Sequence, residues 1–287
     1  TKNLEAYLKM MKGLHHHFFY NKDDNETARR FFEEAITLDP NYANAYVRWA
    51  WTFWQEASSG WTNSTWESYE KAIELAKKAI TLDEQHAGAY MVLANVYTKT
   101  GQFEKAMAAA KKGLSLDPAS SYIIAEDGLT LYNLGQFKEA IPFFEKAIRM
   151  DPKPQTWFLG MLGASYYKMG KFKEAISFLE KAISIDQEPP SWCLALLGES
   201  YYEIDKDKEA ITFLKEAIRI DPKPPSWYTV VLRNSYCRMG ISYYETGRFK
   251  EAIPFLKEAI RLTPTPSSWH LELLGASYYK MGKLEEA

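Results

Sequence analysis

GQFKEAIPFFEKAIRMDP at residues 135–152 decides the fold, because close copies stand at 170–186 (GKFKEAISFLEKAISID) and at 247–264 (GRFKEAIPFLKEAIRLTP). Within each copy, apolar residues recur three and four positions apart, which is the spacing of an amphipathic helix. The alanine of the Glu-Ala pair in this frame aligns with Ala28, Ala72, Ala106, Ala140, Ala175, Ala210, Ala252 and Ala287. These alanines are 44, 34, 34, 35, 35, 42 and 35 residues apart, so the chain is an array of repeats with a period near 34 residues.

Each repeat reads as two amphipathic helices, and no strand pattern appears in the sequence. Gly163, Gly198 and Gly275, with the alanines of the frame, remove side-chain bulk so that paired helices can approach closely. We expect the second helices to end at the Asp-Pro pairs 39–40, 117–118, 151–152 and 221–222, because proline cannot continue the hydrogen-bond ladder. One pair of helices cannot bury its apolar face alone, so the sequence predicts a stack in which neighbours stabilise one another.

This period, with glycine, tyrosine, alanine and proline in a fixed order, resembles the tetratricopeptide repeat (TPR) family. The family marks in the fifth unit are Leu162, Gly163, Tyr166, Ala175, Leu179 and Ala182. Three kinds of departure occur: Asp205 replaces the turn glycine, Glu84 and Gln187 replace the terminal proline, and His15-His16 stand where Leu-Gly is expected. The resemblance implies an all-α fold, an α-solenoid of tandem helix-turn-helix units that form a right-handed superhelix.

The resemblance makes residues 1–287 a single TPR array. Its units are predicted at about 9–42, 43–86, 87–120, 121–155, 156–190, 191–232, 233–267 and 268–287, the last of them truncated. The 44-residue spacing places extra residues near 58–66, after which Ser64 and Glu67 form a capping-box pattern that starts a helix to Leu82. The 42-residue spacing adds seven residues, about two helical turns, and predicts a lengthened first helix from about residue 226.

Helical geometry separates the core positions of each first helix from a second, opposite face. Counted from the first residue of that helix, positions four, seven, eight and eleven lie on one side, and positions two, five, nine, twelve and thirteen lie on the other. In TPR proteins the second face lines a concave groove that binds partners. The candidate partner-binding residues on or beside it are Trp54, Asn95, Lys99, Tyr132, Asn133, Trp157, Tyr167, Lys168, Trp192, Glu199, Tyr202, Tyr244, Trp269 and Tyr279.

Aromatic residues make up 15% of the chain, with 9 Trp and 19 Tyr, and many of them fall at positions two and twelve. Partner binding is one explanation, because interface hot spots favour Trp and Tyr. Packing against the next repeat is the alternative. The resemblance argues against a clamp for a carboxyl terminus, because the slot for the gripping lysine holds Val47, Met91, Ala125, Gly160 and Ala195.

The sequence contains no signal for nucleic-acid binding, membrane insertion, catalysis or metal binding. Lys plus Arg is 35 and Asp plus Glu is 37, so the net charge of -2 gives no field that attracts nucleic acid, and no run is apolar enough to insert into a membrane. No nucleotide-binding, nucleophile-elbow or zinc-protease motif occurs, and we expect no enzyme activity and no cofactor. His15, His16 and His17 point about 100° apart on a helix, so they predict no metal site, and Cys193 and Cys237 predict no disulfide.

The sequence therefore predicts a non-catalytic scaffold that binds a protein or peptide in an aromatic-lined concave groove. One alternative is homo-oligomerisation through the lengthened helix near residues 227–243 or through Trp61 and Trp66. The opening block also resembles the C-terminal TPR region of bacterial class III adenylate/guanylate cyclases and ToxR-like regulators, which implies a regulatory segment of a larger protein as a further alternative. We expect a cytoplasmic location, or a periplasmic one if a membrane span lies upstream.

Overall fold

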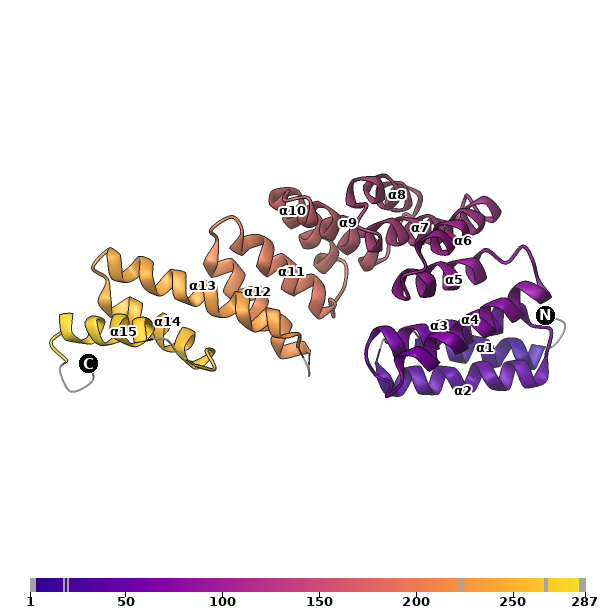
Figure 1. Cartoon of the computed structure of the whole chain (residues 1–287), viewed down its shortest axis with the longest axis horizontal. Coiled ribbons are helices and arrows are strands. Elements are labelled where there is room, and N and C mark those ends of the chain that lie inside the picture. The colour runs from indigo at the N-terminus through magenta and orange to yellow at the C-terminus, as the bar shows by residue number, and fades with distance from the viewer. Residues whose placement is uncertain (1–3, 18, 20, 222–223, 266–267, 284–287) are drawn as a thin grey trace. The chain divides into compact units, whose positions relative to one another are not determined.

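The computed structural model describes residues 4–17, 19, 21–221, 224–265 and 268–283. These residues form fifteen helices and no strand, which confirms the all-α tandem repeat (Figure 1). In chain order the helices are α1 (Leu4–His17), α2 (Lys22–Leu38), α3 (Ala43–Ser58), α4 (Thr65–Leu82), α5 (Ala87–Lys99), α6 (Phe103–Leu116), α7 (Ser121–Asn133), α8 (Phe137–Met150), α9 (Thr156–Lys168), α10 (Phe172–Ser184), α11 (Ser191–Tyr202), α12 (Asp207–Ile220), α13 (Ser226–Glu245), α14 (Phe249–Arg261) and α15 (Ser268–Lys280).

The chain divides into two compact units, Thr1–Pro152 and Lys153–Ala287, where the sequence predicted a single array. Unit 1 contains α1 to α8, and unit 2 contains α9 to α15. In each unit an odd-numbered first helix pairs with the even-numbered second helix that follows it. Ala287 lies outside the described residues, and the other seven alanines of the repeated frame are all fully buried between such helices.

The first helices form the inner layer of each unit. Successive first helices contact one another, as α3 contacts α5 and α5 contacts α7, whereas in the described part of the chain no second helix contacts another second helix. Neighbouring repeats are thus close together on the side of their first helices and farther apart on the side of their second helices. A stack of such repeats curves toward the first helices. The exposed side of the first helices is therefore the inner, concave face of each unit, and we call it the inner face.

The helix ends follow the signals in the sequence. Helices α2, α6, α8 and α12 end at Leu38, Leu116, Met150 and Ile220, each one residue before an Asp-Pro pair. Ser64 caps α4 by accepting a hydrogen bond of 3.4 Å from the backbone N–H of Glu67. The extra residues of this repeat are shared between the loop 59–64 and two long helices, the 16-residue α3 and the 18-residue α4.

The lengthened first helix is α13, which has 20 residues against 12 in α11. It runs from Ser226 to Glu245 without a break, so the repeat boundary predicted between residues 232 and 233 falls inside a helix and belongs before Ser226. Helix α1 likewise begins at Leu4, earlier than the predicted start of the first unit at residue 9. In the part of the chain that the structure describes, no helix is long and apolar enough to cross a membrane.

The turn between α11 and α12 contains Asp205 at φ 59°, the one described residue other than glycine with a positive φ. The turn that follows α9 has Gly170 at φ 72° in the same place. Glycine adopts this left-handed conformation without the steric cost that a side chain adds. We expect Asp205→Gly to raise the free energy of unfolding by about 1 kcal/mol, because the ion pair of this 87% exposed side chain with Arg238 contributes little.

Urea unfolding measures this difference, and the reciprocal variant Gly170→Asp is its matched control, with an expected loss of about 1 kcal/mol. A less stable Asp205→Gly chain would show that the contacts of Asp205 outweigh its backbone strain.

Candidate partner-binding site

The fourteen predicted residues differ in how much of each side chain solvent reaches. Lys99, Lys168, Trp269 and Tyr279 are exposed, and Asn95 is buried. The others are half-buried: Trp54, Tyr132, Asn133, Trp157, Tyr167, Trp192, Glu199, Tyr202 and Tyr244. Their contacts within the chain decide which surfaces remain for a partner.

The tyrosines at position twelve pack against the start of the following second helix. Ring centroids are 5.1 Å apart for Tyr132 and Phe137, 5.5 Å for Tyr167 and Phe172, and 5.4 Å for Tyr244 and Phe249. In these three repeats the aromatic pair packs the end of the first helix against the start of the second. One side of each ring is used in this way within its own repeat, whereas the alternative drawn from the sequence was packing against the next repeat.

Trp192 packs between repeats. A Cβ atom added at Gly160 of α9 would lie only 2.5 Å from the Cη2 atom of Trp192, so the indole fills the space that the glycine leaves. Trp157 is held differently: its indole N–H donates to the Oε1 atom of Gln155 at 2.7 Å, and its ring meets Phe158 edge-on at 4.5 Å. Trp192 is thus an inter-repeat contact, and Trp157 is a half-buried ring at the beginning of unit 2.

Three of the predicted residues come together on the inner face of unit 2. The phenol of Tyr167 and the carboxyl of Glu199 form a hydrogen bond between α9 and α11, and the charge of Lys168 lies close by. Burial raises the pKa of Glu199, and the other two groups oppose this rise. The ammonium of Lys168 is also 5.7 Å from the centroid of the Tyr167 ring. This cluster is a polar edge beside the aromatic rings of α9 and α11.

Tyr202 is covered by a residue that the sequence analysis missed. The guanidinium of Arg238, on α13, lies 3.7 Å from the centroid of the Tyr202 ring and donates to the Tyr202 carbonyl oxygen at 2.6 Å. It also donates to the Oδ1 atom of Asp207 at 2.8 and 3.0 Å and to that of Asp205 at 2.9 Å. Arg238 therefore holds α13 against the turn between α11 and α12. The seven added residues, about two helical turns, leave Arg238 on the side of α13 that faces this turn.

In unit 1, polar side chains are buried between neighbouring first helices. Asn95, predicted as a partner contact, is 1% exposed and donates to the Oε2 atom of Glu126 at 2.7 Å and to the Met91 carbonyl oxygen at 3.1 Å. Asn95 therefore links α5 to α7. The sequence of α5 alone does not show that Glu126 of α7 stands opposite Asn95 as an acceptor. Burial raises the pKa of Glu126 to about 7, although hydrogen bonds with Asn95 and Tyr122 oppose the rise.

Arg48 on α3 extends this polar region. Its charge acts on His17, His86 and Tyr122, which come from α1, from the residue before α5 and from α7. Burial and this charge lower the pKa of His17 to about 4 and also lower that of His86, where Asp83 opposes the change. We call these residues and their hydrogen-bonded neighbours the inner cluster: His17, Arg48, His86, Asn95, Tyr122 and Glu126.

The inner cluster holds polar atoms that nothing satisfies. The Nε atom of Arg48 and the Nδ1 atoms of His17 and His86 are buried and have no hydrogen-bond partner among the described residues. No Asp or Glu of the described ranges lies within ion-pair distance of Arg48. Buried polar groups are nearly always paired in folded proteins, so such a group points to a missing partner. The cluster thus contains a cationic side chain whose buried Nε atom has no acceptor among the residues that the structure describes.

Sequence reasoning missed Arg48 and Glu126 for a geometric reason. Both stand at position six of their helices, which lies about 20° outside the predicted inner arc at about 100° per residue. The available signal was a single arginine in the otherwise apolar run YVRWAWTFW of α3. An ionisable residue inside such a run needs a specific partner.

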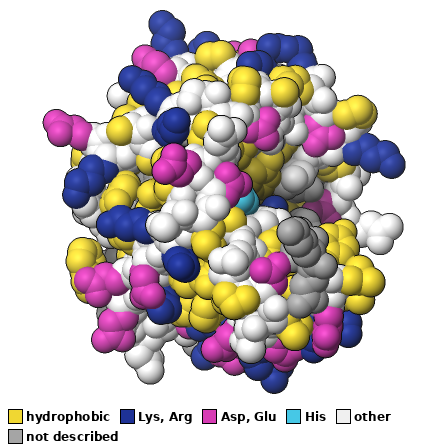
Figure 2. Space-filling view, turned by 90° about the vertical axis from the view of Figure 1, so that its right-hand side faces the viewer, with side chains coloured by type: hydrophobic (Ala, Val, Ile, Leu, Met, Phe, Trp, Pro, Cys, Tyr) yellow, Lys and Arg dark blue, Asp and Glu magenta, His cyan; other side chains and the backbone are white. Residues whose placement is uncertain are grey.

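The three adjacent histidines have different surroundings. The imidazole of His15 meets Phe19 edge-on at 5.1 Å, His16 Nδ1 lies 2.6 Å from the Oδ1 atom of Asp24, and His17 faces Phe32. In the described ranges, no three His, Cys, Asp or Glu side chains are grouped so that they could hold a metal ion. Figure 2 shows a hollow with a histidine in it, around which acidic and basic side chains are interspersed.

Three family models match the chain. The model described as anaphase-promoting complex, cyclosome, subunit 3 matches residues 65–147 and 133–217, which together are more than half of the 287 residues. Two tetratricopeptide repeat models match residues 234–266 and 17–42. A comparison with curated proteins finds no match. None of these models names a cyclase or a ToxR-like regulator, so that part of the resemblance stays a prediction.

Solved structures share the fold at low sequence identity. A chain of the APC/C hetero-tetramer Cut9–Hcn1 is 15% identical with a TM-score of 0.62, over 92% of this chain and 48% of its own length. This chain therefore spans about half of that one. PilF of Pseudomonas aeruginosa is 16% identical with a TM-score of 0.58, over 82% of this chain and 96% of its own. A TPR protein of Thermus thermophilus is 19% identical with a TM-score of 0.55, over 69% and 98%.

The period of the sequence, the paired helices with buried alanines and the matches to family models agree with one another. The chain belongs to the tetratricopeptide repeat family.

Proposed function

We propose that this chain is a non-catalytic scaffold that binds a protein segment on the inner face of unit 1, with an acidic group of the segment at Arg48. Tetratricopeptide repeat folds generally mediate contacts between proteins. The observation that carries the proposal is the buried Nε atom of Arg48, which has no hydrogen-bond partner among the described residues and lies among other buried atoms without partners. A carboxylate from a partner supplies an acceptor that the described residues do not provide.

The energetics favour such a partner. A guanidinium partly removed from water loses hydration that no acceptor replaces, whereas a carboxylate gives it charge-assisted hydrogen bonds of planar, bidentate geometry. A bound carboxylate also raises the pKa of His17 and of His86, which burial and the charge of Arg48 lower. Binding is then linked to proton uptake, so we expect tighter binding at pH 5.5 than at pH 7.5.

For unit 2 we keep the proposal of aromatic contacts with a partner, from fewer residues than the sequence predicted. The half-buried Trp157 and Tyr167 are edged by Lys168 and Glu199, and they suit an apolar stretch of a protein partner. Trp192 is a poor site for an alanine test, because removing its ring opens a cavity above Gly160 and lowers stability as well.

A phage-displayed library of random peptides tests the proposal. We expect the chain to enrich peptides that contain Asp or Glu, and the Arg48→Met variant to enrich no such peptides, because methionine keeps the length of the side chain without its charge. Arg149→Met is the matched control, since the side chain of Arg149 on α8 is 69% exposed and lies on a second helix. Equal enrichment of acidic peptides by the Arg48→Met variant contradicts the proposal.

Self-association is a second candidate, favoured by the start of α13. Trp227 and Val230 stand one helical turn apart on this helix and are 36% and 42% exposed. Sedimentation velocity between 1 and 100 μM tests the candidate: a dimer that Trp227→Ser with Val230→Ser abolishes supports it. A monomer at every concentration excludes it.

A further inference from the structure

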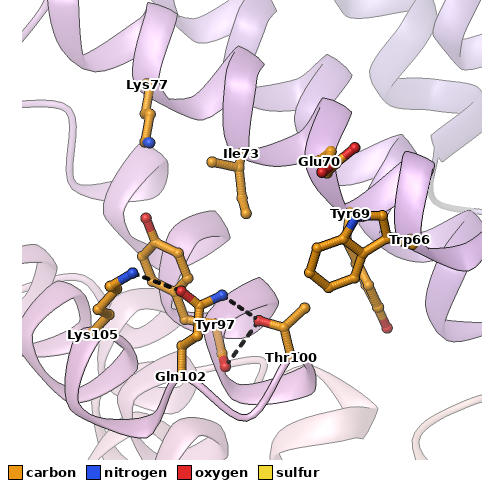
Figure 3. Close-up of a pocket in the computed structure, with 9 residues that line it drawn as sticks. All are labelled: Trp66, Tyr69, Glu70, Ile73, Lys77, Tyr97, Thr100, Gln102 and Lys105. Carbon is orange, nitrogen blue, oxygen red and sulfur yellow. Dashed lines mark hydrogen bonds between the residues drawn. The ribbon is translucent and has the colours of Figure 1, made fainter.

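A pocket of about 300 Å³ lies in unit 1 between α4 and the turn that joins α5 to α6 (Figure 3). None of the residues that line it belongs to the inner cluster. The pocket is therefore separate from the site proposed above. Its first lining residue in the sequence, Trp66, is the last of the extra residues 58–66 of the second repeat.

One wall of the pocket is a single face of α4. Trp66, Tyr69, Ile73 and Lys77 stand three and four residues apart on this helix, so their side chains project on one side. Trp66 is in the first turn, beyond the Ser64 cap, and it is 58% exposed, whereas Tyr69 is 7% exposed. In Figure 3 the two rings occupy one end of this wall, Ile73 the middle and Lys77 the other end.

The facing wall is held by hydrogen bonds within the α5–α6 turn. The ammonium of Lys105 donates to the Oε1 atom of Gln102 at 2.7 Å, and the amide of Gln102 donates to the Oγ1 atom of Thr100 at 2.9 Å. The same ammonium is 5.6 Å from the centroid of the Tyr97 ring. The side chains of Tyr97 and Lys105 are thus positioned by their neighbours before any partner arrives.

The charges of the pocket are separated. Lys77 and Lys105 lie toward the end occupied by Tyr97, and Glu70 lies toward the end occupied by Trp66 (Figure 3). Neither lysine forms an ion pair with an acidic side chain of the described residues. One end therefore suits an anion, and the rings of Trp66 and Tyr97 with the side chain of Ile73 suit an apolar planar group.

We propose that this pocket binds an aromatic side chain that has a carboxylate beside it in a protein segment. The aromatic ring lies over Ile73 between Trp66 and Tyr97, and the carboxylate meets the ammonium groups of Lys77 and Lys105. A polypeptide fits better than a free small molecule, because small-molecule sites enclose most of their ligand and here Trp66 stays more than half exposed.

Fluorine NMR of the full chain labelled with 5-fluorotryptophan tests this proposal, with Trp66→Phe to assign the resonance of Trp66. The probe is the peptide acetyl-Gly-Phe-Asp-Gly-Ser-amide, with matched peptides in which Phe is Ala or Asp is Lys. We expect a saturable shift of the Trp66 resonance with the Phe-Asp peptide only. The resonance of Trp269, which is exposed in unit 2, serves as the internal reference and stays in place.

The lysines are tested by a paired substitution. We expect Lys77→Gln with Lys105→Gln to raise the dissociation constant of the Phe-Asp peptide about tenfold, and Lys78→Gln with Lys112→Gln, on the same two helices outside the pocket, to change it less than about twofold. An unmoved Trp66 resonance, equal binding of the Phe-Lys peptide, or equal loss in the control pair overturns the proposal. Binding of free N-acetyl-phenylalanine as tight as that of the peptide overturns the assignment to a protein segment.

Discussion

Gly198→Val is expected to lower the free energy of unfolding by about 3 kcal/mol, because the added side chain has no space between two packed helices of unit 2. Gly198 lies in α11 where this helix crosses α12. A Cβ atom there would be 2.7 Å from the Cγ atom of Leu214 and 3.1 Å from the carbonyl oxygen of Ala210. One of these neighbours is backbone and the other is a fully buried side chain, so neither can move without separating the two helices.

Whether Gly198→Val lowers or raises the free energy of unfolding shows which of two effects is larger, the crowding between α11 and α12 or the helix propensity of valine. Valine forms helix somewhat better than glycine, so an uncrowded Gly198→Val chain would be as stable as the parent or more stable. Thr212→Val, at an exposed position of α12, is the matched control and should change stability by less than about 0.5 kcal/mol. Urea unfolding followed by circular dichroism measures both, and a stable Gly198→Val chain would contradict the close contact of α11 and α12.

Glu126→Gln is expected to make unit 1 more stable at pH 8 by about 3 kcal/mol, and to change its stability little at pH 5. Burial raises the pKa of Glu126 from an ordinary 4.5 to about 7 in the folded chain. The folded state thus holds the proton more tightly than the unfolded state does. The stability that this proton confers is complete below pH 4.5 and is lost as the pH rises through 7, at about 1.4 kcal/mol per pH unit.

Glutamine keeps the oxygen that accepts from Asn95 and cannot ionise, so the variant lacks this pH dependence. The groups that face Glu126 are Asn95 on α5 and Tyr122 on its own helix, and neither ionises between pH 5 and 8. Glu139→Gln, at an exposed position of α8, is the matched control and should leave the pH profile unchanged. Unfolding free energies at pH 5, 6, 7 and 8 measure the difference, and parallel profiles for the parent and Glu126→Gln would contradict the assignment.

The sequence predicts the framework of this fold because each signal for it is local. Asp-Pro pairs end helices wherever they occur, Ser64 caps α4, and the added seven residues lengthen α13 while keeping its face in phase. Asp205 adopts the left-handed conformation of the glycine that it replaces, because the turn requires that conformation. Each of these features depends on a few residues that are adjacent in the sequence.

The candidate site was harder to predict because it depends on contacts between repeats. The helical wheel places Trp192 and Asn95 correctly on a face of one helix, and it cannot show that Gly160 or Glu126 stands opposite on the next. Arg48 lies just outside the arc that the wheel defines, and its meaning comes from the histidines that other helices bring beside it. The sequence shows which face of its own helix a side chain occupies. The groups that this side chain contacts on neighbouring helices are known only from the structure of the stacked repeats.

Isothermal titration calorimetry of a selected acidic peptide tests the central claim, that the inner cluster of unit 1 binds an acidic group of a partner at Arg48. The comparison uses the parent chain, Arg48→Met and the control Arg149→Met at pH 6.5. We expect a dissociation constant at least about tenfold higher for Arg48→Met and nearly unchanged for Arg149→Met. A peptide that binds Arg48→Met as tightly as the parent would contradict it.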